Sequence, residues 1–201
     1  VRFIPGHSVA DDNEFLKELA LKLSSSDRIL PGGMLYVTDI LCSPHIVVRL
    51  GEIFRSRLQH LAIDYVMTVE TRGISLAILV ARAFNVPLVM ARHDNYFTEG
   101  PTVNINYVSG SAKEIRTMGL PKRALQPGSR ILVVDDVMKA GGTARGMIEL
   151  ATEVGANVVG KAFLIETATP ENKLVDDYTA FFRLYDIDEE ARKITIEPIL
   201  G

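Results

Sequence analysis

The sequence contains no tryptophan and only one cysteine, Cys42, among its 201 residues. A single cysteine can form neither an internal disulfide nor a cysteine-based zinc site, so both kinds of cross-link are excluded and a cytoplasmic, reducing location is expected. The histidines are also few, and they are scattered without the spacing of metal ligands at His7, His45, His60 and His93. Structural or solvated roles are therefore favoured for each of them.

Long apolar runs and an excess of positive charge are missing as well. The longest uncharged apolar stretch, GISLAILVA, ends at Arg82 and is far too short to cross a bilayer. The formal net charge of −3 gives no overall positive field that would attract nucleic acid or an acidic membrane. Apolar residues make up 47% and charged residues 23%, which is typical of a folded globular protein, and we expect one domain over residues 1–201.

Patterns of helix and strand alternate along most of the chain. Apolar residues recur at spacings of three and four between Asp11 and Leu23, which predicts a helix with Asp11 or Asp12 as its cap. Further helices are predicted over 43–61, 73–85 and 142–155, and strands over 34–41, 63–69, 86–92, 129–136 and 156–166. Near-continuous apolar strands indicate a mostly parallel sheet with helices on both faces. Residues 179–187 and 193–200 are expected to form a C-terminal antiparallel hairpin.

The segment from His93 to Arg123 interrupts this alternation. It is polar, contains glycine and is longer than an ordinary connection. Such segments are usually lids or mobile hairpins over a binding site.

The stretch ILVVDDVMKAGGTARG, residues 131–146, places two acids and two glycines after an apolar strand. Ligands of parallel sheets collect at the carboxyl ends of strands, where Asp135 and Asp136 are expected. Gly141 and Gly142 have no Cβ, so backbone amides of the loop can approach an anion closely. The helix that follows points its free amides at the same place, which predicts a phosphate site.

Acids beside a phosphate site repel the ligand unless they serve another part of it. Ribose hydroxyls, which donate hydrogen bonds to carboxylates, meet this requirement, and a magnesium ion held partly through water is a second possibility. The Lys-Ser/Thr pair of a P-loop and a G-x-G-x-x-G fingerprint are both absent. The order therefore favours ribose with a 5′-phosphate, although the acids could simply end a strand while the glycines form a turn.

This stretch resembles the phosphoribosyl pyrophosphate (PRPP) motif of the type I phosphoribosyltransferases, and the resemblance covers residues 34–166. It implies the type I phosphoribosyltransferase fold with a flexible lid hairpin. It also implies that Asp135 and Asp136 bind the ribose, that Mg²⁺ accompanies the ligand and could contact both acids, and that the 5′-phosphate is bound by Lys139, Ala140, Gly141, Gly142 and Thr143. These enzymes usually carry threonine immediately before the two glycines, so Ala140 removes a hydroxyl donor.

Two further segments fit the same resemblance. MTVETRGIS places Thr71, Arg72 and Gly73 between a strand and a helix, as in the pyrophosphate loop of these transferases, although Arg72 could equally be a solvated loop residue. The polar segment occupies the position of the lid. The lid residues implied are Tyr107, Ser109, Gly110, Ser111 and Lys113, which could fold over the pyrophosphate and exclude water or could form a solvated hairpin without ligand contact.

LPGGMLYVTDIL, RHDNYFTEGPTVNINYVSGS, TMGLPKR and DDVMKAGGTARGMI resemble the effector domain of the Gram-positive purine operon repressor family. This resemblance implies a homodimeric regulator without catalytic residues, which binds PRPP as its signal. DNA binding would come only through an N-terminal winged-helix domain missing from this chain, with residues 1–10 as the remnant of a linker.

An active purine phosphoribosyltransferase of the xanthine or adenine type is the alternative. Such an enzyme mainly needs geometry, since pyrophosphate leaves the ribose as a base nitrogen attacks, and no strong general base is required. Ala140 and the repressor resemblance favour the sensor. A dimerisation module with a vestigial pocket is a third possibility, but it would not need acids and a phosphate loop together.

Overall fold

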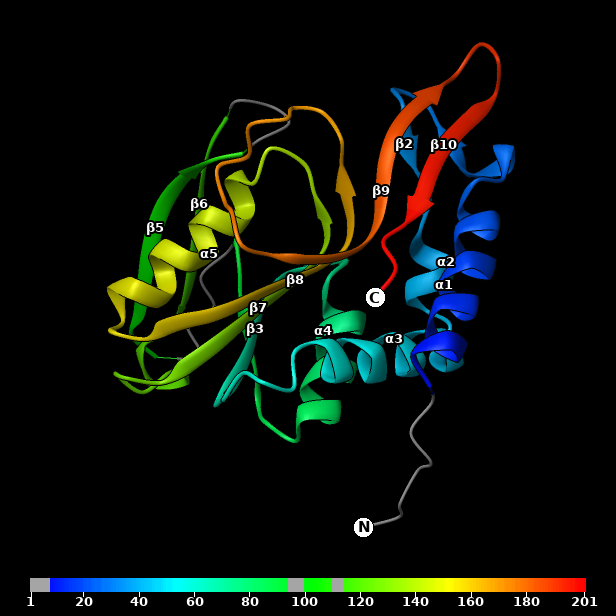
Figure 1. Cartoon of the computed structure of the whole chain (residues 1–201). Helices are drawn as coiled ribbons and strands as arrows, with labels where there is room; N and C mark the ends of the chain where they lie inside the picture. The colour runs from blue at the N-terminus through cyan, green and yellow to red at the C-terminus, as the bar shows by residue number, and fades with distance from the viewer. Residues whose placement is uncertain (1–7, 94–99, 110–113) are drawn as a thin grey trace.

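A computed structural model describes residues 8–93, 100–109 and 114–201. Its centre is a six-stranded sheet in the order β10-β9-β8-β7-β3-β4 (Figure 1). The strands are β3 (Tyr65–Val69), β4 (Leu88–Ala91), β7 (Arg130–Met138), β8 (Asn157–Thr167), β9 (Thr179–Asp188) and β10 (Lys193–Pro198). All neighbours pair in parallel except β9 and β10, which form the predicted C-terminal antiparallel hairpin.

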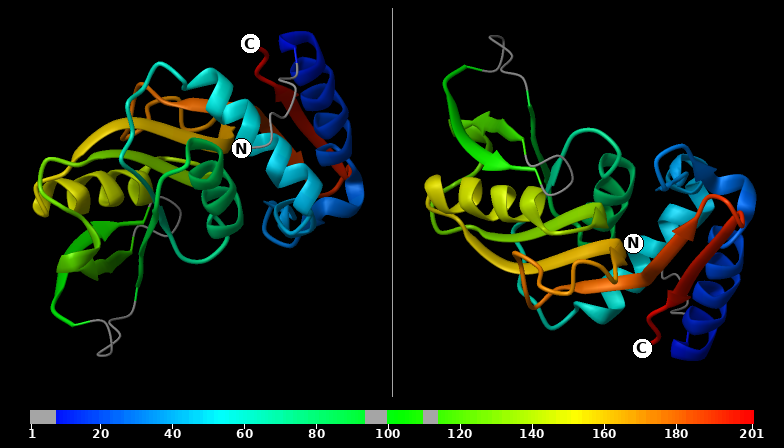
Figure 2. Two further views of the ribbon diagram at one scale, coloured as in Figure 1. Left: turned by 90° about the horizontal axis from the view of Figure 1, so that it is seen from below. Right: turned by 90° about the horizontal axis from the view of Figure 1, so that it is seen from above.

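One face of the sheet is covered by the first four helices. These are α1 (Val9–Leu23), α2 (Thr38–Leu41), α3 (Pro44–Arg57) and α4 (Ile74–Phe84). Their apolar faces share one core with the sheet, in which Leu16, Leu50 and Val80 meet Leu132 of β7 and Phe181 of β9. Figures 1 and 2 show α1 beside the β9–β10 hairpin at one end of the molecule. The α4 helix ends at Asn85, the predicted end, whose left-handed backbone (φ 57°) terminates it.

The other face carries α5 (Gly142–Glu153) and a separate antiparallel hairpin, β5 (Thr102–Val108) and β6 (Ile115–Pro121). A second core lies on this face of β7, and it contains Met147 and Leu150 of α5 and Met118 of β6. A bridge between Arg92 and Gly119 joins the end of β4 to this hairpin. The predicted parallel sheet with cover on both faces is therefore confirmed, and the polar segment does form a hairpin.

The start of α1 differs from the prediction. Ser8, not Asp11 or Asp12, is the N-cap, and its side-chain oxygen accepts a hydrogen bond from the Asp11 amide. Asp11 in turn accepts from the Ser8 amide, which completes a capping box. Of the expected linker residues 1–10, residues 8–10 belong to this cap and helix, and residues 1–7 lie outside the described part of the chain.

The strand predicted over 34–41 was wrong for its second half. Only Met34–Leu35 forms a strand, β2, which pairs with β1 (Ile29–Leu30), whereas Thr38–Leu41 forms α2. The reason is tertiary packing, which overrides local strand preference. Ile40 is fully buried in the helical core, and the carboxylate of Asp39 receives two hydrogen bonds from the buried Arg28 guanidinium, at 2.7 and 2.8 Å.

Candidate functional site

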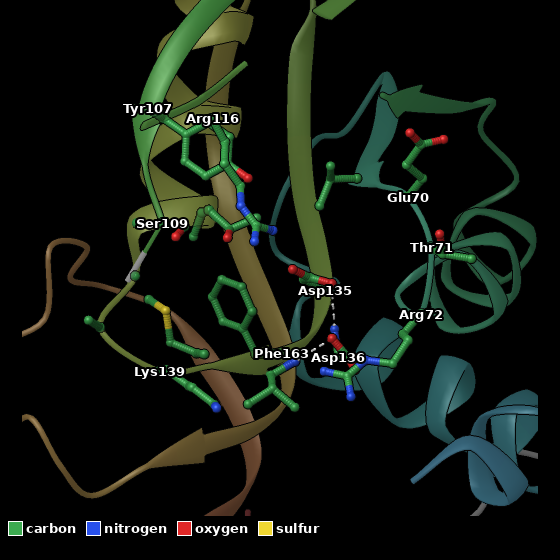
Figure 3. A pocket seen from close by; sticks show the side chains of 18 of the residues that line it. Glu70, Thr71, Arg72, Tyr107, Ser109, Arg116, Asp135, Asp136, Lys139 and Phe163 are labelled. Carbon is green, nitrogen blue, oxygen red and sulfur yellow. Dashed lines mark hydrogen bonds and ion pairs between the residues drawn. The ribbon is translucent and has the colours of Figure 1, made fainter. Parts of the chain in front are cut away.

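A cavity of 470 Å³ lies at the carboxyl ends of β3 and β7 (Figure 3). It is lined by residues 69–72 after β3, by residues 135–144 from β7 into α5, and by Tyr107, Ser109 and Arg116 of the hairpin. The acid pair lies between the hairpin side chains and the 70–72 loop. Segments predicted separately to bind ribose, phosphate and pyrophosphate therefore face one space.

Asp135 and Asp136 are both buried at the end of β7. Asp135 Oδ1 accepts a hydrogen bond from the Asp136 amide at 2.9 Å, and Asp136 Oδ1 accepts one from the Val137 amide at 2.9 Å. Burial raises the pKa of Asp135 well above its ordinary value, and the neighbouring Asp136 carboxylate raises it further. A ligand that donates hydrogen bonds or carries a cation would relieve this repulsion.

Arg72 contacts the acid pair from the side of the 70–72 loop. Its Nε lies 2.9 Å from Asp136 Oδ2, and its side chain is 56% exposed while that of Asp136 is 7% exposed. The guanidinium is therefore largely in solvent, although the carboxylate that it contacts is buried. The exposed Thr71 lines the same cavity, and the Glu70–Thr71 peptide bond before it is cis.

Gly73 does not line the cavity but fixes the loop against it. A Cβ at this position would lie 2.5 Å from Asp135 Oδ1 and 2.7 Å from Thr68 Oγ1, too close for any side chain. The third residue of the predicted pyrophosphate loop is thus a close-approach glycine that brings the loop onto the acid pair.

The loop before α5 has the geometry expected of an anion site. Gly141 has φ 89°, a left-handed conformation that suits glycine, and α5 begins at Gly142, so its first turn, with free backbone amides, lines the cavity. Lys139 is exposed at the rim. The Ala140 carbonyl accepts a hydrogen bond from the Leu174 amide at 2.9 Å, so the connection between β8 and β9 supports the loop from behind.

Arg145, the other cation in residues 131–146 apart from Lys139, does not line the cavity. Its Nε is 2.8 Å from Glu149 Oε1, one turn further along α5. Lys139 is therefore the cation of this motif that faces the site.

The β5–β6 hairpin supplies the opposite wall. Tyr107 packs its ring against Gly146 of α5, where a Cβ would lie 3.0 Å from Tyr107 Cγ. Burial raises the pKa of the Tyr107 hydroxyl, and a hydrogen bond with Thr143 opposes that shift. Ser109 Oγ is buried without a hydrogen-bond partner among the described residues. Three of the predicted lid residues, Gly110, Ser111 and Lys113, lie outside the described part of the chain.

Several lining residues were not anticipated from the sequence. Glu70 accepts a hydrogen bond from the His93 amide at 2.9 Å, which ties the loop after β3 to the end of β4. Arg116 of β6 adds an exposed guanidinium. Phe163 lines the cavity from β8 and meets Tyr178 edge to face at 5.6 Å. Glu70 adjoins the recognised loop and could have been found there, but Phe163 is indistinguishable from core residues in an apolar strand.

Within the described residues, no cluster of three or more His, Cys, Asp or Glu side chains is placed to hold a metal ion. The acid pair offers two carboxylates, so a Mg²⁺ ion here would need further oxygen ligands from a bound molecule and water. No helix in the described part of the chain is long and apolar enough to span a membrane.

Comparison with known proteins agrees with this geometry. The phosphoribosyl transferase domain family matches residues 37–195. Over 197 residues, or 98% of this chain, the sequence is 46% identical to the purine biosynthesis transcriptional repressor PurR of Bacillus subtilis, of whose length it covers 69%. It is 38% identical over 197 residues to the purine biosynthesis transcriptional activator PurR of Lactococcus lactis, covering 98% of this chain and 73% of that protein.

The fold is also that of solved phosphoribosyltransferases. Adenine phosphoribosyltransferase from Saccharomyces cerevisiae superposes with a TM-score of 0.71 at 24% identity, covering 83% of this chain and 98% of the yeast chain. The sequence matches show that the chain belongs to the phosphoribosyl transferase domain family and, within it, to the purine biosynthesis transcriptional regulators.

Proposed function

We propose that this domain binds PRPP with Mg²⁺ as the allosteric signal of a regulator of purine biosynthesis genes. The observation that supports this most is the convergence of the Asp135–Asp136 pair, the Gly141 loop and Arg72 on one cavity. The Gly141 loop and Arg72 suit anions, and the two acids suit hydroxyl groups. This combination matches a sugar that carries a phosphate at one end and a pyrophosphate at the other.

Each part of PRPP has a partner in this proposal. The 5′-phosphate would accept hydrogen bonds from the amides of residues 140–143 and from the Thr143 hydroxyl, with Lys139 nearby. The ribose hydroxyls would donate to Asp135 and Asp136. The pyrophosphate would draw Arg72 away from Asp136 and contact the loop at Thr71, and Mg²⁺ would bind the pyrophosphate oxygens and the acid side of the cavity through water.

The hairpin would complete the enclosure. Ser109 Oγ, which has no hydrogen-bond partner in the described part of the chain, and the exposed Arg116 guanidinium face the cavity from the side opposite Thr71 (Figure 3). A buried hydroxyl without a partner costs stability, so an anionic ligand that accepts its hydrogen bond would be favoured.

A regulatory role is favoured over catalysis by two observations. The relatives with the highest identities reported above are named as transcriptional regulators. Ala140 also lacks the hydroxyl that the enzymes usually place before the two glycines. In this proposal the domain works as a cytoplasmic homodimer, and DNA contact is made by an N-terminal winged-helix domain outside this chain.

A purine phosphoribosyltransferase is the second candidate, because the fold is shared with adenine phosphoribosyltransferase. When the domain is incubated with PRPP, Mg²⁺ and adenine, guanine, hypoxanthine or xanthine, we expect no nucleotide above the uncatalysed background. Chromatography over several hours would measure this, with the yeast adenine enzyme as positive control. Steady nucleotide production proportional to the protein concentration would instead support the enzyme.

A further inference from the structure

Thr68, in β3, has a buried hydroxyl. Its side chain is fully buried, and its Oγ1 has no hydrogen-bond partner in the described structure. Ser109 Oγ, which lines the ligand cavity, is also buried without a hydrogen-bond partner among the described residues. Buried hydroxyls are almost always paired in folded proteins, so an unpaired one beside a site suggests a partner that is present only in another state.

The geometry identifies that partner. The position where Gly73 would carry a Cβ lies 2.7 Å from Thr68 Oγ1 and 2.5 Å from Asp135 Oδ1. The hydroxyl and the carboxylate therefore face the same small gap, which remains open only because residue 73 is glycine. Asp135 Oδ1 accepts one hydrogen bond, from the Asp136 amide, and a carboxylate oxygen can accept another.

Ligand binding would bring these two groups together. In the described structure, Arg72 is paired with Asp136 across the cavity mouth. A ligand with a pyrophosphate and a ribose draws Arg72 toward its phosphates and the acids toward its hydroxyls. Both the loop that carries Gly73 and the carboxylate of Asp135 border the gap that Thr68 faces, so a shift of either on ligand binding would change the distance between the hydroxyl and the carboxylate.

We propose that Thr68 is a positioning residue, whose hydroxyl donates a hydrogen bond to the Asp135 carboxylate in the ligand-bound state. It holds this acid in the orientation that receives the ribose. The role rests on the proposed binding of PRPP, and Thr68 itself does not touch the ligand.

Thr68→Val and Thr68→Ser separate this role from a purely structural one. Valine keeps the shape and removes an unpaired hydroxyl, so the unliganded Thr68→Val domain should melt at or above the wild-type temperature. Its affinity for Mg²⁺–PRPP in calorimetry should fall about tenfold, as expected for one lost hydrogen bond to a charged group. Thr68→Ser keeps the hydroxyl and should bind within about twofold of wild type.

A double-mutant cycle tests whether Thr68 acts through Asp135. In an Asp135→Asn background, Thr68→Val should cause little further loss of affinity, because the acceptor charge is already gone. Wild-type affinity in Thr68→Val overturns the inference, as does equal weakening in both backgrounds or equal weakening in Thr68→Ser. Absence of PRPP binding by the wild-type domain would instead overturn the proposed function, and this inference with it.

Discussion

Asparagine at both Asp135 and Asp136 is expected to weaken PRPP binding more than about 100-fold while the domain stays folded. Each acid would lose a charge-assisted hydrogen bond to the ribose, at about 1.5–3 kcal/mol each, and tenfold in affinity corresponds to about 1.4 kcal/mol. The amide keeps the size of the carboxylate, so the cavity should keep its shape. Titration calorimetry with Mg²⁺–PRPP measures the loss.

The matched control removes the same charge elsewhere. Glu14 and Glu18 are exposed on α1, so glutamine at both positions changes the net charge equally without touching the cavity. This control should bind as wild type. Equal weakening in the control would mean that overall charge, not the acid pair, governs affinity, and unchanged binding by the asparagine double variant would contradict the ribose assignment.

Asp135→Asn alone should also change stability in a direction set by the raised pKa of Asp135. Since the folded pKa lies above the unfolded one, the stability from this group is complete below the unfolded pKa and is lost as pH rises through the folded pKa. Asparagine cannot ionise and avoids that loss. The variant should therefore melt above wild type at neutral pH, with the difference disappearing in acid, and a lower melting temperature at neutral pH would contradict the burial argument.

Gly141→Ala is expected to weaken PRPP binding at least about tenfold, because the left-handed residue that orients the phosphate amides no longer fits. Its φ of 89° strains any other residue by about 1–2 kcal/mol. A Cβ here would also lie 3.3 Å from Met138 Cε and 3.4 Å from the Leu174 amide nitrogen, so the Met138 side chain must give way slightly. Calorimetry measures the affinity, and thermal unfolding should show a decrease of a few degrees.

Gly128→Ala is the matched control for this prediction. Gly128 also has a left-handed φ, of 81°, but nothing lies within 4 Å of a Cβ there, and it precedes the amino end of β7. The control should lose stability through backbone strain alone and keep its affinity. If both alanine variants bind PRPP as tightly as wild type, the Gly141 loop is not the phosphate site.

The main parts of the site could be predicted from the sequence because strand ends in a parallel sheet meet at one edge. Asp135 and Arg72 are far apart in the chain, yet Asp135 lies in the last half of β7 after its apolar run, Arg72 follows β3, and these two strands are neighbours. That adjacency is what places Arg72 against Asp136. The Gly141 loop was recognisable because Gly141 and Gly142 have no Cβ, which lets the backbone amides of the loop approach an anion closely.

Other features depended on tertiary contacts that leave little local signal. The α2 helix exists because Ile40 is buried and Asp39 meets Arg28, although its residues locally favour a strand. The orphaned hydroxyl of Thr68 becomes visible only once Gly73 is packed against Asp135. The Ser8 cap, in contrast, was encoded in the sequence as a serine three residues before an acid and could have been predicted.

The most direct measurement is a calorimetric titration of the wild-type domain with PRPP in the presence of Mg²⁺. Saturable binding of about one ligand per chain, with a higher melting temperature in the presence of ligand, is the expected result. No heat and no thermal shift at millimolar PRPP would contradict the proposal that this cavity is a PRPP sensor.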